Sequence, residues 1–278
     1  MGKKRWVRQL PVYAILLVGV FLIAVPLYIC LITTFKSEAE SAVSFFTFPK
    51  SFYLKNYTEI LTNPKLYYAL VNTLFITAVS LGCNFIIMPA MSYSLSRSMG
   101  ESKFYRAMYY FLLLGIFIPF QVRMMPLVKL MSSLGMLNQG GVVILYIAHA
   151  TCESVFLYVG FLSSISRNLE EAAYIDGAST YQTYTKVVLP LMKPIIATVM
   201  IREGLACWND FMLPLITLNR SWKKWTLTIF QYNFQSEFSV DYSLAFACFV
   251  IASLPIVVFY IIMQKQIIGG LTSGAVKE

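Results

Sequence analysis

Ionisable side chains sit inside stretches of this sequence that are otherwise apolar, where such groups are costly and often functional. His149 and Glu153 are four residues apart, which places them on one face of a helix. The pair could relay a proton, but we favour a structural role, either as a pair near the outer half of its span or as a hydrogen bond to a companion subunit. Arg202 and Glu203 lie in another apolar stretch, where we expect them to pack inside the bundle.

A second polar set combines aromatic rings with amide and carboxylate groups, the combination that binds sugars through ring faces and hydrogen bonds. These candidates for a substrate path are Gln121, Trp208, Asn209, Asp210 and Phe211. The alternative is that they pack the bundle and hinge a broken helix. The sequence leaves both interpretations open.

Other chemistry is scarce in the sequence. It has one histidine and no metal-ligand cluster, and no nucleophile lies beside a base. The sequence therefore offers few catalytic groups for a membrane enzyme. We expect no metal site and no bound cofactor. No Gly-x-x-x-x-Gly-Lys-Ser/Thr sequence occurs, so the phosphate cradle of one nucleotide-binding fold is missing. Five cysteines without Cys-x-x-Cys spacing are assigned to packing.

The composition predicts a membrane protein. Hydrophobic residues make up 58% and charged residues 13% of 278, against about 45–50% and about 25% in soluble domains. A run of ~20 apolar residues crosses the hydrocarbon core as a helix. The sequence therefore predicts an all-α integral membrane protein with six transmembrane helices: Pro11–Thr34, Tyr68–Leu95, Tyr105–Met125, Gly141–Ile165, Ile195–Leu218 and Tyr242–Ile268. Pro119–Leu137 also has the apolar steps of an amphipathic interfacial helix.

The orientation follows from the basic amino-terminal arm, residues 1–10. It carries four basic residues and no acid, and such flanks stay in the cytoplasm. Six crossings then place both termini in the cytoplasm, and the domains are the arm, a permease domain over residues 11–268 and a cytoplasmic tail over residues 269–278. The net charge of +9 indicates membrane topology and contact with anionic lipid, not a nucleic-acid partner.

The connection between the fourth and fifth helices, residues 166–194, is far longer than the usual helix connection of about 2–8 residues. Asn168 can cap a short helix, with Glu171 completing a capping box. Gly177 permits the bent backbone that ends this helix. A second helix is predicted over residues 180–188, ending at Leu189-Pro190 because proline disfavours helical geometry in the preceding residue.

This predicted helix-turn-helix has the character of a docking surface. Glu170 and Glu171 form an acidic tip at the start of the first helix, where the helix dipole favours negative charge. Ala172 and Ala173 present almost no side chain, so another protein can approach closely. We therefore expect a protein partner on the cytoplasmic face.

The order Glu171-Ala172-Ala173, Gly177, Val187 and Leu189-Pro190 resembles the EAA loop of permease subunits of bacterial ABC importers. That loop reads Glu-Ala-Ala, three residues, Gly, nine residues, Ile, one residue, Leu-Pro. Val187 stands where the family has isoleucine, which is conservative in bulk. Other segments resemble the carbohydrate-uptake class, the branch with the shorter maltose-type permease subunit: Asn56-Tyr57, Val71-Asn72-Thr73, Pro119-Phe120-Gln121, Trp208-Asn209-Asp210-Phe211, Pro214-Leu215 and Gly270–Lys277.

The resemblance implies a complex in a bacterial or archaeal cytoplasmic membrane. It would contain a second homologous permease subunit, two ATPase subunits that bind ATP and Mg²⁺, and an extracytoplasmic solute-binding protein. Glu171 would pair with a basic residue of the ATPase, and the carboxyl-terminal tail would reach between the ATPase subunits. The residues expected to couple to the ATPase are Glu170, Glu171, Ala172, Ala173, Asp176, Gly177, Leu189 and Pro190.

The sequence leaves the transported solute open. A sugar or oligosaccharide fits the resemblance, and the alternatives are glycerol phosphate or another polyol. A rival from another class is an ion-coupled secondary transporter, which predicts inverted repeats and interrupted helices around charged midplane sites. We find no such repeat in the sequence.

Overall fold

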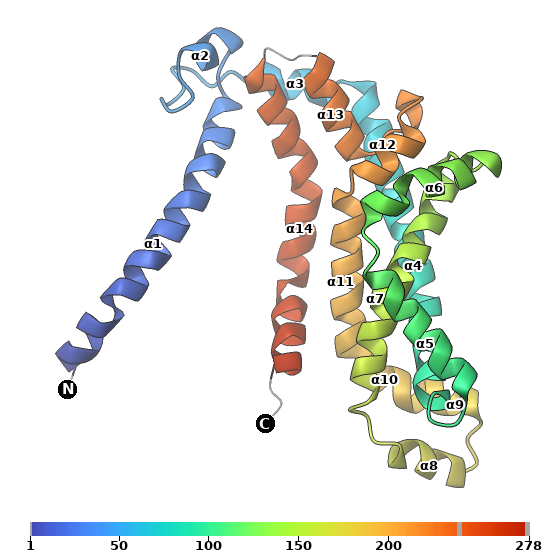
Figure 1. Cartoon of the computed structure of the whole chain (residues 1–278). Helices are drawn as coiled ribbons and strands as arrows, with labels where there is room; N and C mark the ends of the chain where they lie inside the picture. Colours follow the sequence, from blue (N-terminus) through green and yellow to red (C-terminus); the bar gives the residue numbers. More distant parts are fainter. Residues whose placement is uncertain (1, 238–240, 276–278) are drawn as a thin grey trace. The chain divides into compact units, whose positions relative to one another are not determined.

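The structure is a computed structural model that describes residues 2–237 and 241–275. Secondary structure in this part of the chain is helical throughout, which confirms the predicted all-α class. Contacts divide the chain into two compact units, Met1–Tyr67 with Phe230–Leu254 and Tyr68–Ile229 with Pro255–Glu278 (Figure 1). Each unit is described by itself. The last three residues of the predicted tail, 276–278, lie outside the described residues.

Four described helices are long and apolar enough to cross a membrane alone, and up to six spans result if each of two bent helix pairs counts as one. The single helices agree with the first, second, fourth and sixth predicted spans. They are α1 (Gly2–Thr33), α4 (Pro64–Ser98), α7 (Gln139–Leu162) and α14 (Tyr242–Ala275).

The third predicted span, Tyr105–Met125, is not one straight helix. The chain forms α5 (Lys103–Ile116) and α6 (Phe120–Ser133), which meet at 105°. Pro119 precedes α6 with φ −57° and ψ 143°, an extended backbone that cannot continue α5. Proline has no N–H to donate and also disfavours helical geometry in the residue before it. The helix expected over Pro119–Leu137 is present as α6.

The fifth predicted span, Ile195–Leu218, is broken as well. It consists of α11 (Lys193–Asn209) and α12 (Met212–Leu218), with Asp210 extended at φ −67° and ψ 130° between them. The Met212 amide donates to Asp210 Oδ1 at 3.1 Å. This carboxylate therefore satisfies a free N–H at the start of α12.

Residues 166–194, the connection predicted to form a docking surface, are called the docking segment below. They contain α8 (Asn168–Ile175), α9 (Thr180–Thr183), a π-helical turn (Tyr184–Val188) and α10 (Leu189–Leu191). The predicted capping box at Asn168 is wrong, because the residue before α8 makes no side-chain cap and the Asn168 amide itself donates to Ser166 Oγ at 3.3 Å. A complete capping box instead starts α9, where Ser179 and Gln182 bond each other's backbone amides.

The prediction that the second helix ends at Leu189-Pro190 is also wrong. The Leu189 amide donates to the carbonyl of Tyr184, five residues back, and Pro190 sits in the first turn of α10. A proline in an α-helix clashes with the carbonyl four residues earlier. The wider π-helical turn avoids this conflict, so the chain stays helical to Leu191 and then bends by 73° into α11.

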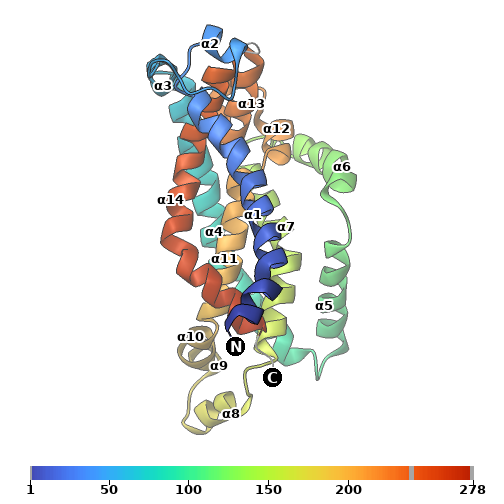
Figure 2. The same ribbon diagram turned by 90° about the vertical axis from the view of Figure 1, so that its left-hand side faces the viewer.

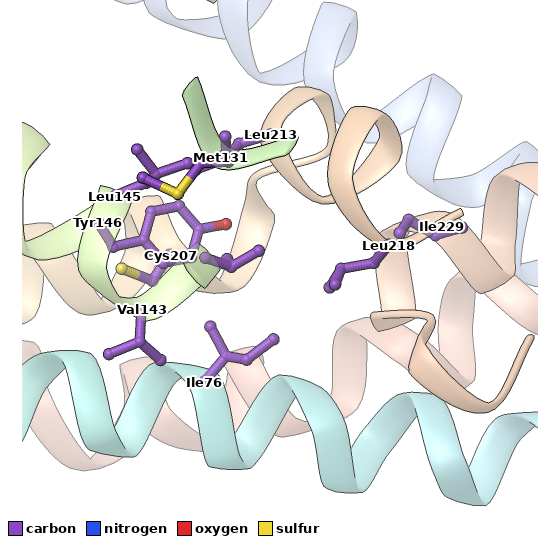
Figure 3. Packing of buried hydrophobic residues seen from close by; sticks show 10 residues of the cluster. Ile76, Met131, Val143, Leu145, Tyr146, Cys207, Leu213, Leu218 and Ile229 are labelled. Carbon is purple, nitrogen blue, oxygen red and sulfur yellow. The ribbon is translucent and has the colours of Figure 1, made fainter. Parts of the chain in front are cut away.

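In the unit that begins at Tyr68, α4, α7 and α11 run side by side (Figures 1 and 2). The helices α8, α9 and α10 gather at one end of these three, and α6 and α12 lie toward the other end. One core cluster joins α4, α6, α7, α11, α12 and the first turn of α13 (Leu227–Glu237) (Figure 3): Ile76, Met131, Val142, Val143, Leu145, Tyr146, Cys207, Leu213, Leu218 and Ile229. A second cluster packs α4 and α7 against the π-helical turn and α11.

In the other unit, α1 is followed by the short helices α2 (Glu38–Val43) and α3 (Lys55–Leu61). Lys36 is fully buried there, and its Nζ donates to the carbonyl of Ser44 at 2.9 Å. Asn56 donates to the carbonyls of Thr34 and Lys36, both at 2.9 Å. These bonds tie α3 to the end of α1. The remaining elements are α13 (Leu227–Glu237), whose residues from Phe230 onward belong to this unit, and a 3-10 turn (Trp222–Lys224) that belongs to the unit that begins at Tyr68.

Candidate functional site

The first candidate site is the docking segment, and Glu170 anchors it. Glu170 is 5% exposed. Its Oε1 accepts from Arg97 Nε at 2.8 Å and lies 2.6 Å from Arg97 NH2, while Oε2 accepts from the Tyr93 hydroxyl at 2.8 Å. Tyr93, Arg97 and Glu170 are called the Glu170 clamp below. Both oxygens of a buried carboxylate thus have partners, as a charge in that position requires.

The Glu170 clamp connects α8 to three other elements. Arg97 NH1 donates to the carbonyl of Leu162 at the end of α7 at 3.1 Å. The Tyr93 ring lies 5.2 Å from the ring of Tyr184 in the π-helical turn, centroid to centroid. Because Tyr93 and Arg97 belong to α4, the clamp connects α8 directly to α4, α7 and the π-helical turn.

The remaining predicted coupling residues are more exposed than Glu170. Glu171, Ala172, Asp176, Gly177 and Pro190 are exposed, whereas Ala173 and Leu189 are partly buried. Exposed apolar groups lie nearby, with Ile175 86% and Tyr181 75% exposed. The two adjacent glutamates therefore differ: Glu170 is buried and bonded within this chain, and Glu171 is exposed.

Gly177 ends α8 as the sequence predicts. Its φ of +84° lies in the left-handed region, which is costly for residues with a Cβ. The Ala178 amide donates to the carbonyl of Ala173 at 2.9 Å, and the Gly177 amide donates to that of Tyr174 at 3.0 Å. The chain can therefore reverse sharply between α8 and α9.

The second candidate site is a cavity of about 390 Å³ in the unit that begins at Tyr68. Its walls come from α6, α7, α11 and α12, and it is called the main cavity below. The lining residues are Phe120, Arg123, Leu127, Leu145, Tyr146, Ala148, His149, Glu203, Ala206, Cys207, Asn209, Asp210 and Leu213. Four of them, Leu145, Tyr146, Cys207 and Leu213, are labelled in Figure 3.

Polar groups of the main cavity are bonded across helices. The Tyr146 hydroxyl donates to Asp210 Oδ2 at 3.0 Å, which links α7 to the break between α11 and α12. Arg123 NH2 lies 2.8 Å from His149 Nδ1, so α6 is linked to α7. At this distance the guanidinium donates to the imidazole nitrogen.

The structure pairs His149 and Glu153 with residues of other helices. His149 pairs with Arg123, and Glu153 forms an ion pair with Arg202 of α11. Arg202 NH1 also lies 3.5 Å from Glu203 Oε1. The structural role expected for these residues therefore involves contacts between helices, not a pair on one helix face.

The structure separates the predicted substrate-path residues. Asn209 and Asp210 line the main cavity, whereas Trp208 lines a second, mostly apolar cavity of about 280 Å³ with residues of α4 and α14. Gln121 and Phe211 line neither cavity. Sequence reasoning missed Arg123 and Tyr146 because a single basic or aromatic residue in an apolar run gives no spacing signal.

Residues 85–271 match the model of the family described as binding-protein-dependent transport system inner membrane component. The chain belongs to this family. The matched region of this inner membrane component includes Glu170, all the lining residues of the main cavity and the whole docking segment.

Individual relatives cover nearly the whole inner membrane component. The multiple sugar-binding transport system permease protein MsmG of Streptococcus mutans is 40% identical over 278 residues, all of both chains. The melibiose/raffinose/stachyose import permease protein MelC of Bacillus subtilis is 34% identical and covers 91% of each chain. The carbohydrate-uptake resemblance seen in the sequence is thereby confirmed.

A solved structure supports the fold. A chain of a bacterial ABC transporter involved in the import of the acidic polysaccharide alginate superposes with a TM-score of 0.78 at 22% identity. The superposition covers 93% of the inner membrane component and 96% of the solved chain. The arrangement of helices described above is therefore that of an ABC importer permease.

Proposed function

We propose that this chain is the permease subunit of an ABC importer that brings a sugar or oligosaccharide into the cell. The observation that carries the coupling part of the proposal is the exposed face of α8, where Glu171 and Ala172 are exposed while Glu170 bonds the helix to Arg97. The sugar part is supported by relatives whose names specify multiple sugars, starch degradation products and melibiose, raffinose or stachyose.

The proposed complex lies in a bacterial cytoplasmic membrane. It contains this chain, a second homologous permease subunit, two ATPase subunits and an extracytoplasmic solute-binding protein. The family description, a binding-protein-dependent system, supports the last of these. ATP and Mg²⁺ bind to the ATPase subunits, and this chain carries no cofactor. The tail over residues 269–278, which we expected between the ATPase subunits, stays a prediction.

The proposed coupling starts where the ATPase meets α8. Glu171 pairs with a basic residue of the ATPase, and Ala172 and Ala173 let the two surfaces approach closely. Closure of the ATPase subunits around ATP displaces α8. The Glu170 clamp passes this displacement to α4 and α7, and α10 passes it to α11. Tilting of these helices then opens the path to one side of the membrane or the other.

The charge reversal Glu171→Lys tests this proposal in the assembled importer. Truncating one partner of a buried interface charge pair costs about 2 kcal/mol or more, so we expect at least ~30-fold weaker coupling of binding-protein-stimulated ATP hydrolysis to sugar uptake. Glu101→Lys is the matched control, because Glu101 is also exposed and lies in the turn between α4 and α5. Unchanged uptake and ATPase stimulation in Glu171→Lys, with normal assembly, would exclude the contact.

A further inference from the structure

We propose that the connection between α12 and α13 binds the phosphate group of an anionic phospholipid, while an apolar row on α4 holds one of its acyl chains. The connection carries three cations, Arg220, Lys223 and Lys224, and two tryptophans, Trp222 and Trp225, and residues 220–225 are called the basic loop below. The inference rests on the proposed function for one point, the side of the membrane. With α8 meeting an ATPase in the cytoplasm, the basic loop lies at the outer end of the helices.

The basic loop runs against the usual charge pattern of membrane proteins. Basic residues collect in the cytoplasmic loops of such proteins. The basic loop, however, directly follows α12, which lies toward the end of its unit opposite to α8 (Figures 1 and 2). It carries three cations within five residues, and no acid lies in the sequence between Asp210 and Glu237. This concentration of outer positive charge indicates an anionic ligand.

No acid of the described chain neutralises these cations. Among residues 2–237 and 241–275, Arg220, Lys223 and Lys224 take part in no ion pair. Lys223 Nζ lies 5.7 Å from the centroid of the Trp222 ring, a cation–π contact that leaves the positive charge in place. Arg220, Trp222 and Lys223 are all exposed. The loop can therefore donate charge-assisted hydrogen bonds to the oxygens of a phosphate.

The backbone of the basic loop is held in place by α4. Asn72 Nδ2 donates to the carbonyls of Lys223 and Trp225, at 2.9 Å and 3.0 Å. The Trp222 ring meets the Tyr68 ring edge to face, with the centroids 5.2 Å apart. A loop that is already ordered loses less conformational entropy when it binds a ligand. The cations are thus held at a fixed position near the start of α4.

An apolar row on α4 begins at the residue that contacts the basic loop. Tyr68, Val71, Phe75 and Val79 lie on one face of the helix, because they are three or four residues apart. These residues are 40%, 44%, 52% and 36% exposed. Eleven positions separate the ends of the row, about 16 Å at the rise of an α-helix. This length matches one leaflet, half of the roughly 30 Å hydrocarbon core.

The combination of cations and apolar row favours a lipid over an acidic protein. Tryptophan and tyrosine rings prefer the headgroup zone of a membrane, and the contact between Trp222 and Tyr68 joins the cations to the row. A protein docking from the aqueous side would use the cations and leave the row unused. An anionic phospholipid uses both, since its charge and its acyl chain are linked in one molecule.

The assembled importer, purified in detergent and titrated with phosphatidylglycerol, provides the test. Native mass spectrometry gives the apparent dissociation constant of the tightest phosphatidylglycerol site. The site variant replaces all three cations of the basic loop, and the control removes the same charge from three other exposed lysines. The substitutions in the site variant are Arg220→Gln, Lys223→Gln and Lys224→Gln, and those in the control are Lys50→Gln, Lys55→Gln and Lys129→Gln.

The expected effects follow from the charge and from the acyl chain. A Lys or Arg near an anionic headgroup contributes about fivefold in affinity, so the dissociation constant should rise at least ~10-fold in the site variant and less than ~2-fold in the control. A charge-preserving variant, Arg220→Lys with Lys223→Arg and Lys224→Arg, should bind phosphatidylglycerol as the wild type does. Glycerophosphoglycerol, the headgroup without acyl chains, should compete at least ~10-fold less well than the intact lipid.

The outcomes separate the two proposals. Equal dissociation constants in the site variant and the control would overturn the lipid site and leave the proposed function intact. Full competition by glycerophosphoglycerol would overturn the role of the apolar row. A site variant that keeps phosphatidylglycerol but loses affinity for the solute-binding protein, measured in phosphatidylcholine nanodiscs, would overturn the lipid site in favour of a protein contact. Failure of wild-type cells to take up any sugar of a broad panel would overturn the proposed function, and the lipid affinities would stand.

Discussion

Two groups of charges in this permease are arranged in opposite ways. In the Glu170 clamp, the side chains of Arg97 and Glu170 are 16% and 7% exposed, and both carboxylate oxygens are bonded. Beside the main cavity, the side chains of Arg202 and Glu153 are 40% and 39% exposed. The charges of the clamp are buried and bonded within the chain, whereas the more exposed charges beside the cavity can also bond to water or solute.

The Glu170 clamp and the main cavity lie at different heights along the same helix, α7. The clamp bonds α7 at the carbonyl of Leu162, and His149 of α7 lines the main cavity and is bonded by Arg123. Thirteen residues of helix separate these positions, about 20 Å at the rise of an α-helix. A single helix, α7 (Gln139–Leu162), thus connects the Glu170 clamp to the main cavity.

The largest expected effect comes from breaking the Glu170 clamp. Arg97→Met leaves Glu170 buried without its cation, so we expect a loss of about 3 kcal/mol in the free energy of unfolding, measured by denaturant titration in detergent. Adding Glu170→Gln removes the orphaned charge and should recover more than half of the loss. If the double variant is no more stable than Arg97→Met, the buried charge is not the cause.

A smaller effect is expected from the other partner of Glu170. Tyr93→Phe removes one hydrogen bond to a buried carboxylate and keeps the ring beside Tyr184, so it should cost about 2 kcal/mol in the same titration. Tyr110→Phe on the exposed face of α5 is the control and should change stability by less than about 0.5 kcal/mol. Equal effects would show that Tyr93 contributes only its ring.

Next in size is the turn after α8. Gly177→Ala places a Cβ at a φ of +84°, and no atom lies within 4 Å of that Cβ, so the cost is conformational and amounts to about 1 kcal/mol. Gly160→Ala in α7 also meets nothing within 4 Å, has no left-handed φ, and should not destabilise the protein. Faster proteolysis of the docking segment in Gly177→Ala alone is the readout; equal rates would contradict the strain.

The smallest effect should come from the open charges. Glu153→Gln breaks the ion pair with Arg202, but pairs this exposed contribute about 0–1 kcal/mol. We expect a change of about 0.5 kcal/mol in the unfolding titration used for Arg97→Met. A loss as large as that of Arg97→Met would show that the two groups of charges are equally rigid, and the comparison would fail.

Much of the architecture could be predicted from the sequence because apolar runs of the right length are a direct signal of membrane helices. The docking segment was also predictable, since Gly177 and the Glu-Ala-Ala order carry their meaning in local spacing. The two broken spans were left undecided, since a hinge in a broken helix was only one of two interpretations of Gln121, Trp208, Asn209, Asp210 and Phe211. Their interruption depends on Pro119 and on the Asp210 carboxylate capping α12, local events that a count of apolar residues averages away.

The roles of the two adjacent glutamates were beyond local reasoning. Sequence placed Glu170 and Glu171 together as coupling residues, yet Glu170 turns toward Arg97, which is 73 positions away in the chain. Likewise, His149 and Glu153 were paired by spacing, but each found a partner on another helix. Long-range partners of charged residues depend on helix packing, which periodicity does not encode.

The π-helical turn at Tyr184–Val188 fits one more residue into the backbone than an α-helical path of the same rise would hold. The turn absorbs this extra residue locally, so the helical segments before and after it keep nearly the directions of an uninterrupted α-helix. Removing one residue there would restore ordinary winding and set the Pro190 ring against the carbonyl four residues before it. The extra residue is therefore what lets a proline stand inside a helical segment that continues to Leu191.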